Sequence, residues 1–136
     1  MELSVQQEAL LRRSRNGILS TVGADGSPHV APVWYLWTGG EIRVSTPGTT
    51  QKVRDIERNP RVALCVDDQV AAEYLTLYGR ADIVTGERVT DLTWPLLLSY
   101  LPEEEAAVRW KRINAGGSRV VIVLRPDRLH GRERAR

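Results

Sequence analysis

One lysine lies directly behind a run of hydroxyl side chains, an arrangement that suits the binding of a phosphate. The chain has 19 lysine and arginine residues, but only Lys52 and Lys111 are lysines. Lys52 follows the segment "STPGTTQ", which places four hydroxyl residues just before it: Ser45, Thr46, Thr49 and Thr50. Hydroxyls can donate hydrogen bonds to anionic oxygens, and a lysine adds a full positive charge. The segment 45–52 therefore has the chemistry of an anion site.

The same segment also has the form of an ordinary connection between a strand and a helix. Pro47-Gly48 predicts a turn. Thr49 or Thr50 can then cap a helix that extends to about Arg58. The first turn of such a helix offers free backbone N–H groups and a partial positive charge, which attract anions. Taken alone, the segment is compatible with a phosphate site or with a plain strand–turn–helix joint.

A strand rich in aromatic residues, "VAPVWYLW" (30–37), offers a flat apolar surface. Because side chains alternate along a strand, Trp34 shares a face with Pro32, and Tyr35 shares the other face with Val33. Pro32 cannot donate a ladder hydrogen bond, so it predicts a sheet edge or a bulge. Two interpretations stay open. The strand is an edge strand with aromatic core residues, or it is a surface for a flat heterocycle whose phosphate lies at the head of the following helix.

Other catalytic patterns are absent from the sequence. His29 and His130 have no cysteine, aspartate or glutamate at metal-ligand spacing, so no metal site is expected. No G-x-S-x-G motif occurs, and Cys65 between Leu64 and Val66 is typical of a buried small residue. If the chain is an enzyme, a bound cofactor must carry the chemistry.

Local signals predict the elements that position these residues. Ser4, with Gln7 three positions later, predicts a capping box and a helix that stops at Asn16-Gly17. Tight turns at 24–26 and 38–40 predict an antiparallel meander, since loops this short cannot make a parallel crossover. Six strands are expected in all: Ile18–Val22, Val30–Trp37, Glu41–Thr46, Val62–Val66, Tyr74–Val84 and Arg119–Arg125.

A helical insert is expected over Val89–Gly117, before the last strand. Thr90–Tyr100 is helical in pattern, with Pro95 at a kink or at the true start, and a second helix runs from Pro102 to about Ile113. The elements together predict one mainly β domain over 1–136. Its expected form is a six-stranded antiparallel β-barrel with added helices: an N-terminal helix, a short helix after the third strand, and the insert. The alternative is an open sheet with helices on one face.

The charge balance is mild and gives little support for nucleic-acid binding. The formal net charge is +2, and Asp127 and Glu133 interrupt the arginines of the last dozen residues, 125–136, which are expected to form a solvated terminus. The N-terminal residues have no apolar core of signal-peptide length, and no apolar run approaches the ~20 residues that span a bilayer. We expect a cytoplasmic protein with neither nucleic-acid nor membrane partners.

Four motifs, in the order in which they occur, resemble those of the pyridoxamine 5′-phosphate oxidase-like flavin-binding split barrels. They are D-G-S-P-H before the second strand, P-V-W-Y within it, S-T-x-x-x-x-x-K, and N-P-R-V-A-L. The resemblance extends from Asn16 to Leu129, although the insert matches only in length and placement. Within that family the chain is most similar to the branch that uses the deazaflavin coenzyme F-420.

The resemblance implies a homodimer with two cofactor sites at the subunit interface, each completed by the partner chain. The cofactor is expected to be reduced F-420 or FMN, and it carries the chemistry, so no side chain is expected to be catalytic. The ring would lie along Pro32, Val33, Trp34 and Tyr35; Ser45 and Thr46 would contact the ribityl–phosphate region; Thr50, Gln51 and Lys52 would hold the phosphate. In the insert, Trp94 and Trp110 are candidates for the partner's share of the pocket.

One departure from the family pattern concerns the phosphate. Family members often carry a basic residue where this chain has Thr50, so one charge is missing unless Arg54 or an arginine of the partner replaces it. Two functions remain open: an oxidoreductase that transfers a hydride to a small conjugated organic substrate, or a non-catalytic carrier of flavin, deazaflavin or haem. Oxidation of pyridoxamine phosphate itself is disfavoured, because no second basic cluster stands out that would hold a substrate phosphate.

Overall fold

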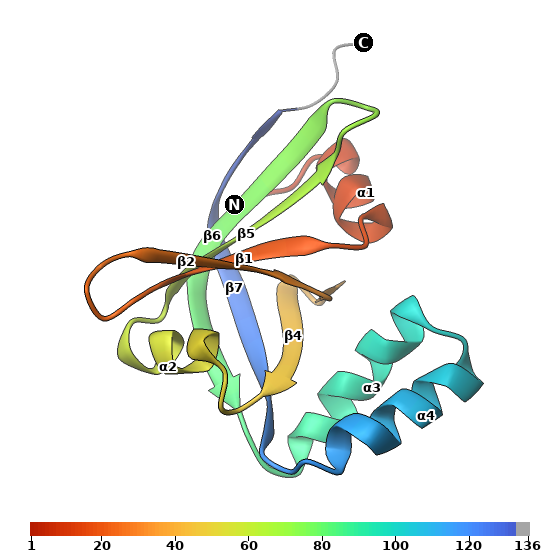
Figure 1. Ribbon diagram of the computed structural model, residues 1–136. Helices are drawn as coiled ribbons and strands as arrows, with labels where there is room; N and C mark the ends of the chain where they lie inside the picture. Colours follow the sequence, from red (N-terminus) through yellow and green to blue (C-terminus); the bar gives the residue numbers. More distant parts are fainter. Residues whose placement is uncertain (133–136) are drawn as a thin grey trace.

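The computed structural model describes residues 1–132, and it confirms a mainly β chain with added helices (Figure 1). The helices are α1 (Val5–Arg13), α2 (Gln51–Arg58), α3 (Arg88–Tyr100) and α4 (Glu103–Asn114). The strands are β1 (Gly17–Val22), β2 (Pro28–Val33), β3 (Leu36–Thr38), β4 (Glu41–Pro47), β5 (Arg61–Asp68), β6 (Glu73–Val84) and β7 (Arg119–Arg132). The described part of the chain thus has seven strands in one sheet, so the predicted number of six is wrong.

The seventh strand arises because the predicted strand Val30–Trp37 is broken at Trp34-Tyr35. The strand order is β2-β1-β5-β6-β7-β4-β3, which puts β2 and β3 at opposite edges of the antiparallel sheet. Two connecting residues span roughly 10 Å at most, so the two edges must come together where β2 leads into β3. The sheet is therefore curled into a barrel. Pro32 lies in β2 at one sheet edge, which confirms the predicted edge position.

The break is fixed by contacts from a distant part of the chain. The backbone N–H of Tyr35 donates to the hydroxyl oxygen of Tyr100 at 3.0 Å, where a continuous strand would donate to a neighbouring strand. The Tyr35 side chain is buried, and its hydroxyl donates to the carbonyl of Leu11 at 2.7 Å. These contacts to α3 and α1 hold the chain while it passes from one edge to the other.

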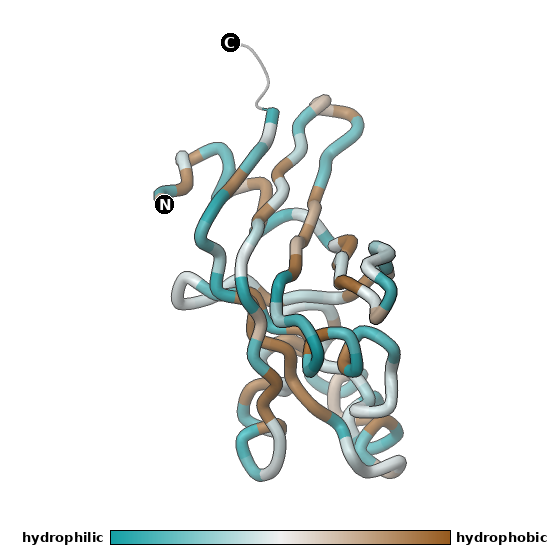
Figure 2. Tube along the Cα trace, turned by 90° about the vertical axis from the view of Figure 1, so that its left-hand side faces the viewer, coloured by the Kyte–Doolittle hydropathy of each residue, from teal (hydrophilic) through white to brown (hydrophobic). Residues whose placement is uncertain are grey.

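The barrel interior is filled by alternate residues of the strands, together with apolar residues of α1 and α2. Figure 2 shows hydrophobic positions interspersed along the strands, while hydrophilic residues prevail toward the C-terminal end of β7. The core includes Leu19, Ile42, Leu64, Leu75, Leu77, Ile122 and Leu124 from strands, Leu10 and Leu11 from α1, and Val53 and Ile56 from α2. Both helices are thereby packed onto the barrel, and the start of α2 is held at a defined place.

The first half of β7 is buried on both faces, which explains the uninterrupted apolar run from Val120 to Leu124. One face belongs to the barrel core. On the other face, Val121 and Val123 pack against Val89 and Leu92 of α3. The pair α3–α4 therefore covers the outside of the barrel beside β4 and β7 (Figure 1).

Helix α1 confirms the predicted capping box but ends earlier than expected. The Ser4 hydroxyl oxygen accepts from the backbone N–H of Gln7 at 3.0 Å, and the Gln7 side chain accepts from that of Ser4 at 2.9 Å. The predicted stop at Asn16-Gly17 is wrong, because the helix ends at Arg13. Gly17 instead begins β1, where a Cβ atom would lie only 2.7 Å from the Leu64 side chain. Its role is close packing rather than helix termination.

The last strand is longer than the predicted Arg119–Arg125. β7 continues through Pro126 to Arg132 and pairs with β6, with an irregularity in the register next to Gly79. The expected solvated terminus, as far as residue 132, is therefore part of the sheet, and residues 133–136 lie outside the described residues. Among the helices of the described part, none is long and apolar enough to cross a membrane.

Candidate functional site

A cavity occupies the place where the barrel wall is left open. β3 pairs with β4 only as far as Arg43, so the rest of this edge of β4 faces no strand in the described sheet. β2, the other sheet edge, lies across the opening. The resulting cavity has a volume of about 250 Å³. The residues that line it come from β2, β4, α2, α3, α4 and β7, which meet only because the sheet closes on itself.

Six of the nine predicted cofactor residues line this cavity. On the β2 side are Pro32, Val33 and Trp34; on the β4 side are Ser45 and Thr46; and Lys52 projects from the first turn of α2. Val33 and Thr46 are buried, whereas Pro32 is exposed. The structure thus brings together the two segments that were predicted separately, the aromatic strand and the hydroxyl–lysine segment.

The other three predicted residues lie outside the lining and make structural contacts. Tyr35 is in the core, where burial raises the pKa of its phenol to about 12. The Thr50 hydroxyl donates to the carbonyl of Pro47 at 3.1 Å, closing the turn before α2. The Gln51 side chain donates to Asp55 at 2.8 Å. Their assignment to the cofactor stays a prediction.

Trp34 forms a wall of the cavity and is held in place by two neighbours. Its ring stacks on that of Tyr100, with 4.4 Å between centroids and 5° between planes. The guanidinium carbon of Arg109 lies over the Trp34 ring, 5.1 Å from its centroid. Stacking and cation–π contacts both favour a fixed ring orientation. The insert therefore contributes to the site by positioning Trp34.

Three cations line the cavity, and no carboxylate does so among the described residues. They come from three different elements: Lys52 from α2, Arg109 from α4 and Arg119 from the start of β7. Burial lowers the pKa of Lys52, and it also lowers the pKa of Arg119. A guanidinium stays protonated even so. The cavity therefore has a positive potential that suits an anionic ligand.

The hydroxyl groups of the cavity belong to a small polar cluster. The Ser45 and Thr93 hydroxyl oxygens are 2.9 Å apart, and Arg119 donates to the Ser45 oxygen at 3.2 Å. Arg54, considered as a replacement for the missing phosphate charge, points elsewhere. It donates to the carbonyl of Thr49 at 2.7 Å, and it is not part of the lining. In addition to Lys52, the lining therefore has a cation from Arg119, whereas Arg54 contributes none.

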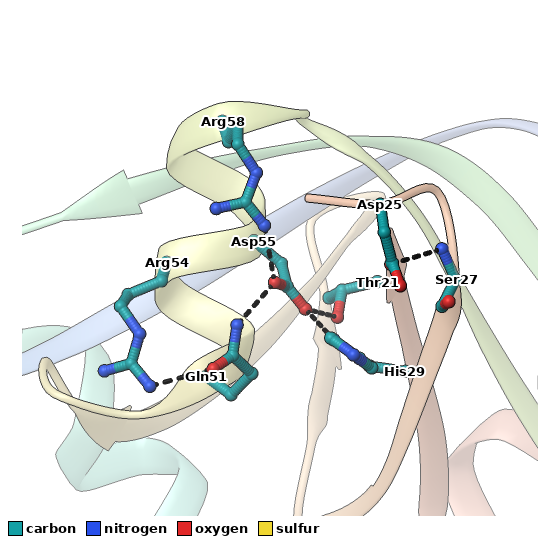
Figure 3. Close-up of polar contacts among 8 residues, drawn as sticks. All are labelled: Thr21, Asp25, Ser27, His29, Gln51, Arg54, Asp55 and Arg58. Carbon is teal, nitrogen blue, oxygen red and sulfur yellow. Dashed lines mark hydrogen bonds and ion pairs between the residues drawn. The ribbon is translucent and has the colours of Figure 1, made fainter. Parts of the chain in front are cut away.

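A buried carboxylate fixes α2, and with it Lys52, against the β1–β2 hairpin (Figure 3). Asp55 accepts from the Thr21 hydroxyl at 2.8 Å, from Gln51 at 2.8 Å and from Arg58 at 3.0 Å, and its oxygen lies 2.6 Å from His29 Nδ1. Burial alone would raise the pKa of the Asp55 carboxyl. The hydrogen bonds from His29, Gln51 and Thr21 outweigh burial and hold that pKa well below its usual range.

The sequence-based interpretation missed the contributions of the insert and of β7. Arg109, Arg119 and Thr93 line the cavity. Trp94 and Trp110 were candidates for the cavity of the partner chain, and that assignment stays a prediction. One signal was available for Arg119, because an arginine opens a strand that is otherwise apolar from Val120 onward. The described residues contain no group of histidine, cysteine or acidic side chains able to hold a metal ion.

Comparison with known proteins identifies the family. Residues 3–133 match the pyridoxamine 5′-phosphate oxidase family. The chain belongs to this family. In this chain the barrel is open between β2 and β4, and the helical pair α3–α4 is set before the last strand.

Solved structures and a curated relative are similar as well. An F-420 reductase has 32% sequence identity and a TM-score of 0.74, over 94% of this chain and 98% of that one. The conserved hypothetical protein Rv2991 from Mycobacterium tuberculosis has 25% identity and a TM-score of 0.80, over 98% and 87%. A 5a,11a-dehydrotetracycline/5a,11a-dehydrooxytetracycline reductase of Streptomyces rimosus is 36% identical over 72 residues, 50% of this chain and 51% of that protein. The chain thus spans about half the length of this curated relative.

Proposed function

We propose that this protein is an oxidoreductase that holds a flavin-type cofactor, reduced F-420 or FMN, in the cavity between β2 and β4. The observation that carries the proposal is the combination of an apolar wall with a cluster of cations and hydroxyls in one cavity. Family membership and the reductases among the similar proteins support it. The substrate class that suits such a site is a small conjugated organic molecule.

The residues present fit the parts of such a cofactor. Pro32, Val33 and the edge of the Trp34 ring offer apolar surface for a flat ring, Ser45 offers a hydroxyl for a polar chain, and Lys52 offers a charge for a phosphate. When bound, the cofactor would supply hydride transfer. The protein's part is to orient the ring through the Trp34 contacts and to exclude water from it with α3 and α4. No side chain needs to exchange a proton for this role.

We also propose that the protein acts as a homodimer whose partner chain completes each site. The cavity of about 250 Å³ is smaller than the roughly 300–1,000 Å³ typical of cofactor sites. Next to it, the outer face of β1 and β2 exposes Ile18 and Val30, and Pro32, in register with Ile18, belongs both to this face and to the cavity lining. A second copy of the chain on this face would cover the apolar surface and also close the cavity.

The test begins with the cofactor-free protein, titrated with FMN and F-420 in parallel while its tryptophan fluorescence is followed. Tight binding of one of them is expected. The reduced complex is then mixed anaerobically with a panel of conjugated enones and quinones. Substrate-accelerated reoxidation of the cofactor supports the oxidoreductase. Binding without any acceleration favours a carrier, and failure of both cofactors to bind would remove the proposal.

A further inference from the structure

A half-buried arginine at the start of β7 faces the cavity without the partner that its charge requires. Arg119 stands opposite Pro47 in the pairing of β7 with β4, which places it beside Ser45 on the outer face of the sheet. There its guanidinium donates once, to the Ser45 hydroxyl at 3.2 Å. Its Nε atom is buried and has no hydrogen-bond partner among residues 1–132. At least one strong donor is therefore left unsatisfied.

Arg119 differs from other arginines of the protein in its exposure and in its ion pairing. Arg13, Arg61 and Arg125 are more exposed, and each forms an ion pair with a carboxylate of a neighbouring element. Within the described part of the chain, Arg119 forms no ion pair, although burial makes its charge more costly to leave unpaired. Because a guanidinium cannot shed its proton in a protein, an anion is the partner that offsets that cost most fully. The described residues provide none, and a bound ligand in the cavity is the anion source that the position of Arg119 in the lining favours.

A second arginine reaches the same cavity from α4. Arg109 lies over Trp34 at 5.1 Å and lines the cavity together with Arg119. A cation–π contact leaves the N–H groups at the edge of the guanidinium free to donate. Among the described residues, Arg109 donates to no hydrogen-bond acceptor of the protein and forms no ion pair with a carboxylate. Two planar donors thus flank the same polar cluster.

We propose that Arg119, with Arg109 and the Ser45 hydroxyl, forms an oxyanion-binding subsite whose binding groups do not include Lys52, although all of them line the same cavity. It takes a phosphate or a carboxylate, the groups whose two oxygens match the planar fork of arginine. This second basic cluster was not visible in the sequence, because its members come from β4, α4 and β7. The anion belongs either to the cofactor proposed above or to the substrate. The assignment of its source rests on the proposed function, whereas the subsite itself does not.

The subsite is tested first with inorganic phosphate as the probe. Thermal unfolding of the full chain is followed as phosphate replaces chloride at constant ionic strength, for the unmodified protein, for Arg119→Gln and for Arg80→Gln. Arg80 is an exposed arginine of β6 outside the lining, so it controls for the loss of one charge. We expect phosphate to raise the melting temperature of the unmodified protein and of Arg80→Gln. Arg119→Gln should need at least about tenfold more phosphate for the same shift.

An equal response of Arg119→Gln and the unmodified protein would overturn the subsite, as would the absence of any phosphate effect in the unmodified protein. If Arg119→Gln does not fold, Arg119→Lys replaces it. That variant keeps the charge but loses the planar fork, so a severalfold weaker response is expected and an unchanged one overturns the proposal.

A second arm identifies where the anion comes from. Whichever cofactor binds is titrated beside its phosphate-free analogue, riboflavin in the case of FMN, into the unmodified protein and Arg119→Gln. If Arg119→Gln has a lower affinity than the unmodified protein for the phosphorylated form alone, the anion belongs to the cofactor. Equal cofactor affinities, together with a raised KM for a carboxylate substrate but not for its methyl ester, assign it to the substrate. If neither cofactor binds while the phosphate response persists, the subsite stands and the proposed function falls.

Discussion

At the scale of single residues, the proposed phosphate site is tested most directly at Lys52. It projects from the first turn of α2 into the cavity lining. Replacing it with alanine should weaken the binding of FMN or F-420 by more than about 1 kcal/mol, since charge-assisted hydrogen bonds contribute roughly 1.5–3 kcal/mol. Lys111→Ala, which removes the other lysine at an exposed position of α4, is the matched control. Unchanged affinity for Lys52→Ala in a fluorescence titration would contradict its role.

Because of the same lysine, cofactor binding should weaken at alkaline pH. Burial lowers the pKa of Lys52 below its ordinary value, and a bound phosphate would raise that pKa again because it favours the charged form. Binding therefore takes up a proton in the interval between the two pKa values. We expect the affinity to fall as pH rises through the lowered pKa of the free protein. Dissociation constants measured against pH should show this fall in the unmodified protein and lack it in Lys52→Ala.

Asp55 is the residue on which the stability of the α2 attachment should depend most. Replacement with asparagine keeps the shape but removes the charge and sets an N–H₂ group against donors such as Arg58 and Gln51. We expect a loss of about 2 kcal/mol in the free energy of unfolding at pH 7. Urea unfolding measures it, with Glu57→Gln on the exposed side of α2 as the control.

The pH dependence of that loss has a definite sign. The pKa of Asp55 is lower in the folded protein than its usual value of about 4 in an unfolded chain. Its contribution is therefore complete above about pH 4 and disappears as pH falls below that value toward the folded-state pKa. The difference between Asp55→Asn and the unmodified protein should shrink in acid. A difference that is constant between pH 7 and pH 3 would show that the network does not depend on the charge.

At the scale of elements, the stack of Trp34 on Tyr100 joins the insert to the barrel. Tyr100 lies at the end of α3, and its hydroxyl also accepts from the backbone of Tyr35 at 3.0 Å. Tyr100→Ala removes both contacts, which together contribute roughly 2 kcal/mol. Amide hydrogen exchange in α3 and α4 should then accelerate by tenfold or more, while exchange in β5 and β6 stays unchanged.

Tyr100→Phe separates the two contacts of this residue, because it keeps the stack and removes the hydrogen bond. An intermediate acceleration of exchange is expected for it. If Tyr100→Ala leaves α3 and α4 as protected as before, their attachment depends instead on the apolar packing of Val89 and Leu92 on β7.

The elements that local chemistry determines were predictable, and those that depend on closure of the sheet were not. The capping box of Ser4 and the start of α2 after Thr50 follow from neighbouring residues. The break at Trp34-Tyr35 does not, because it requires β2 and β3 to belong to opposite edges of one sheet. A single aromatic run in the sequence contains no sign of that division.

The same distinction applies to the site. Ser45, Thr46 and Lys52 lie within one short segment, so their proximity could be inferred from spacing alone. Arg119 is 74 positions from Ser45, and only the pairing of β4 with β7 brings the two together. The packing of α4 beside Trp34 brings in Arg109 in the same way. Sequence spacing therefore predicted the hydroxyls and the lysine, while both arginines required the fold.

At the scale of the whole molecule, the proposed dimer rests on an exposed apolar face continuous with the cavity. Ile18 and Val30 are 42% and 69% exposed on neighbouring strands, and β5 extends the face with Cys65 in register with Ile18. An isolated exposed aliphatic residue needs no explanation, but a row of them at the mouth of an incomplete cavity does. A second copy accounts for both features at once.

Replacing both Ile18 and Val30 with glutamate should therefore abolish the dimer. Two charges on one face would have to be desolvated and would repel their copies across a twofold interface. Sedimentation equilibrium should give about twice the 15.3 kDa chain mass for the unmodified protein and the single mass for the double variant. Val70→Glu, at a position 98% exposed and away from this face, should remain dimeric.

Cofactor binding should follow the dimer if the partner completes the site. The double variant should bind FMN or F-420 at least about tenfold more weakly, with unchanged secondary structure by circular dichroism. Neither substituted residue lines the cavity with Lys52 and Trp34, but Val30 lines an adjoining pocket together with Lys52. The single variant Ile18→Glu, which leaves that pocket unchanged, should therefore show the same loss of cofactor binding if the loss follows the dimer. A monomeric double variant that binds the cofactor as tightly as the unmodified protein would show that one chain forms the whole site. A double variant that remains dimeric would place the interface on another face.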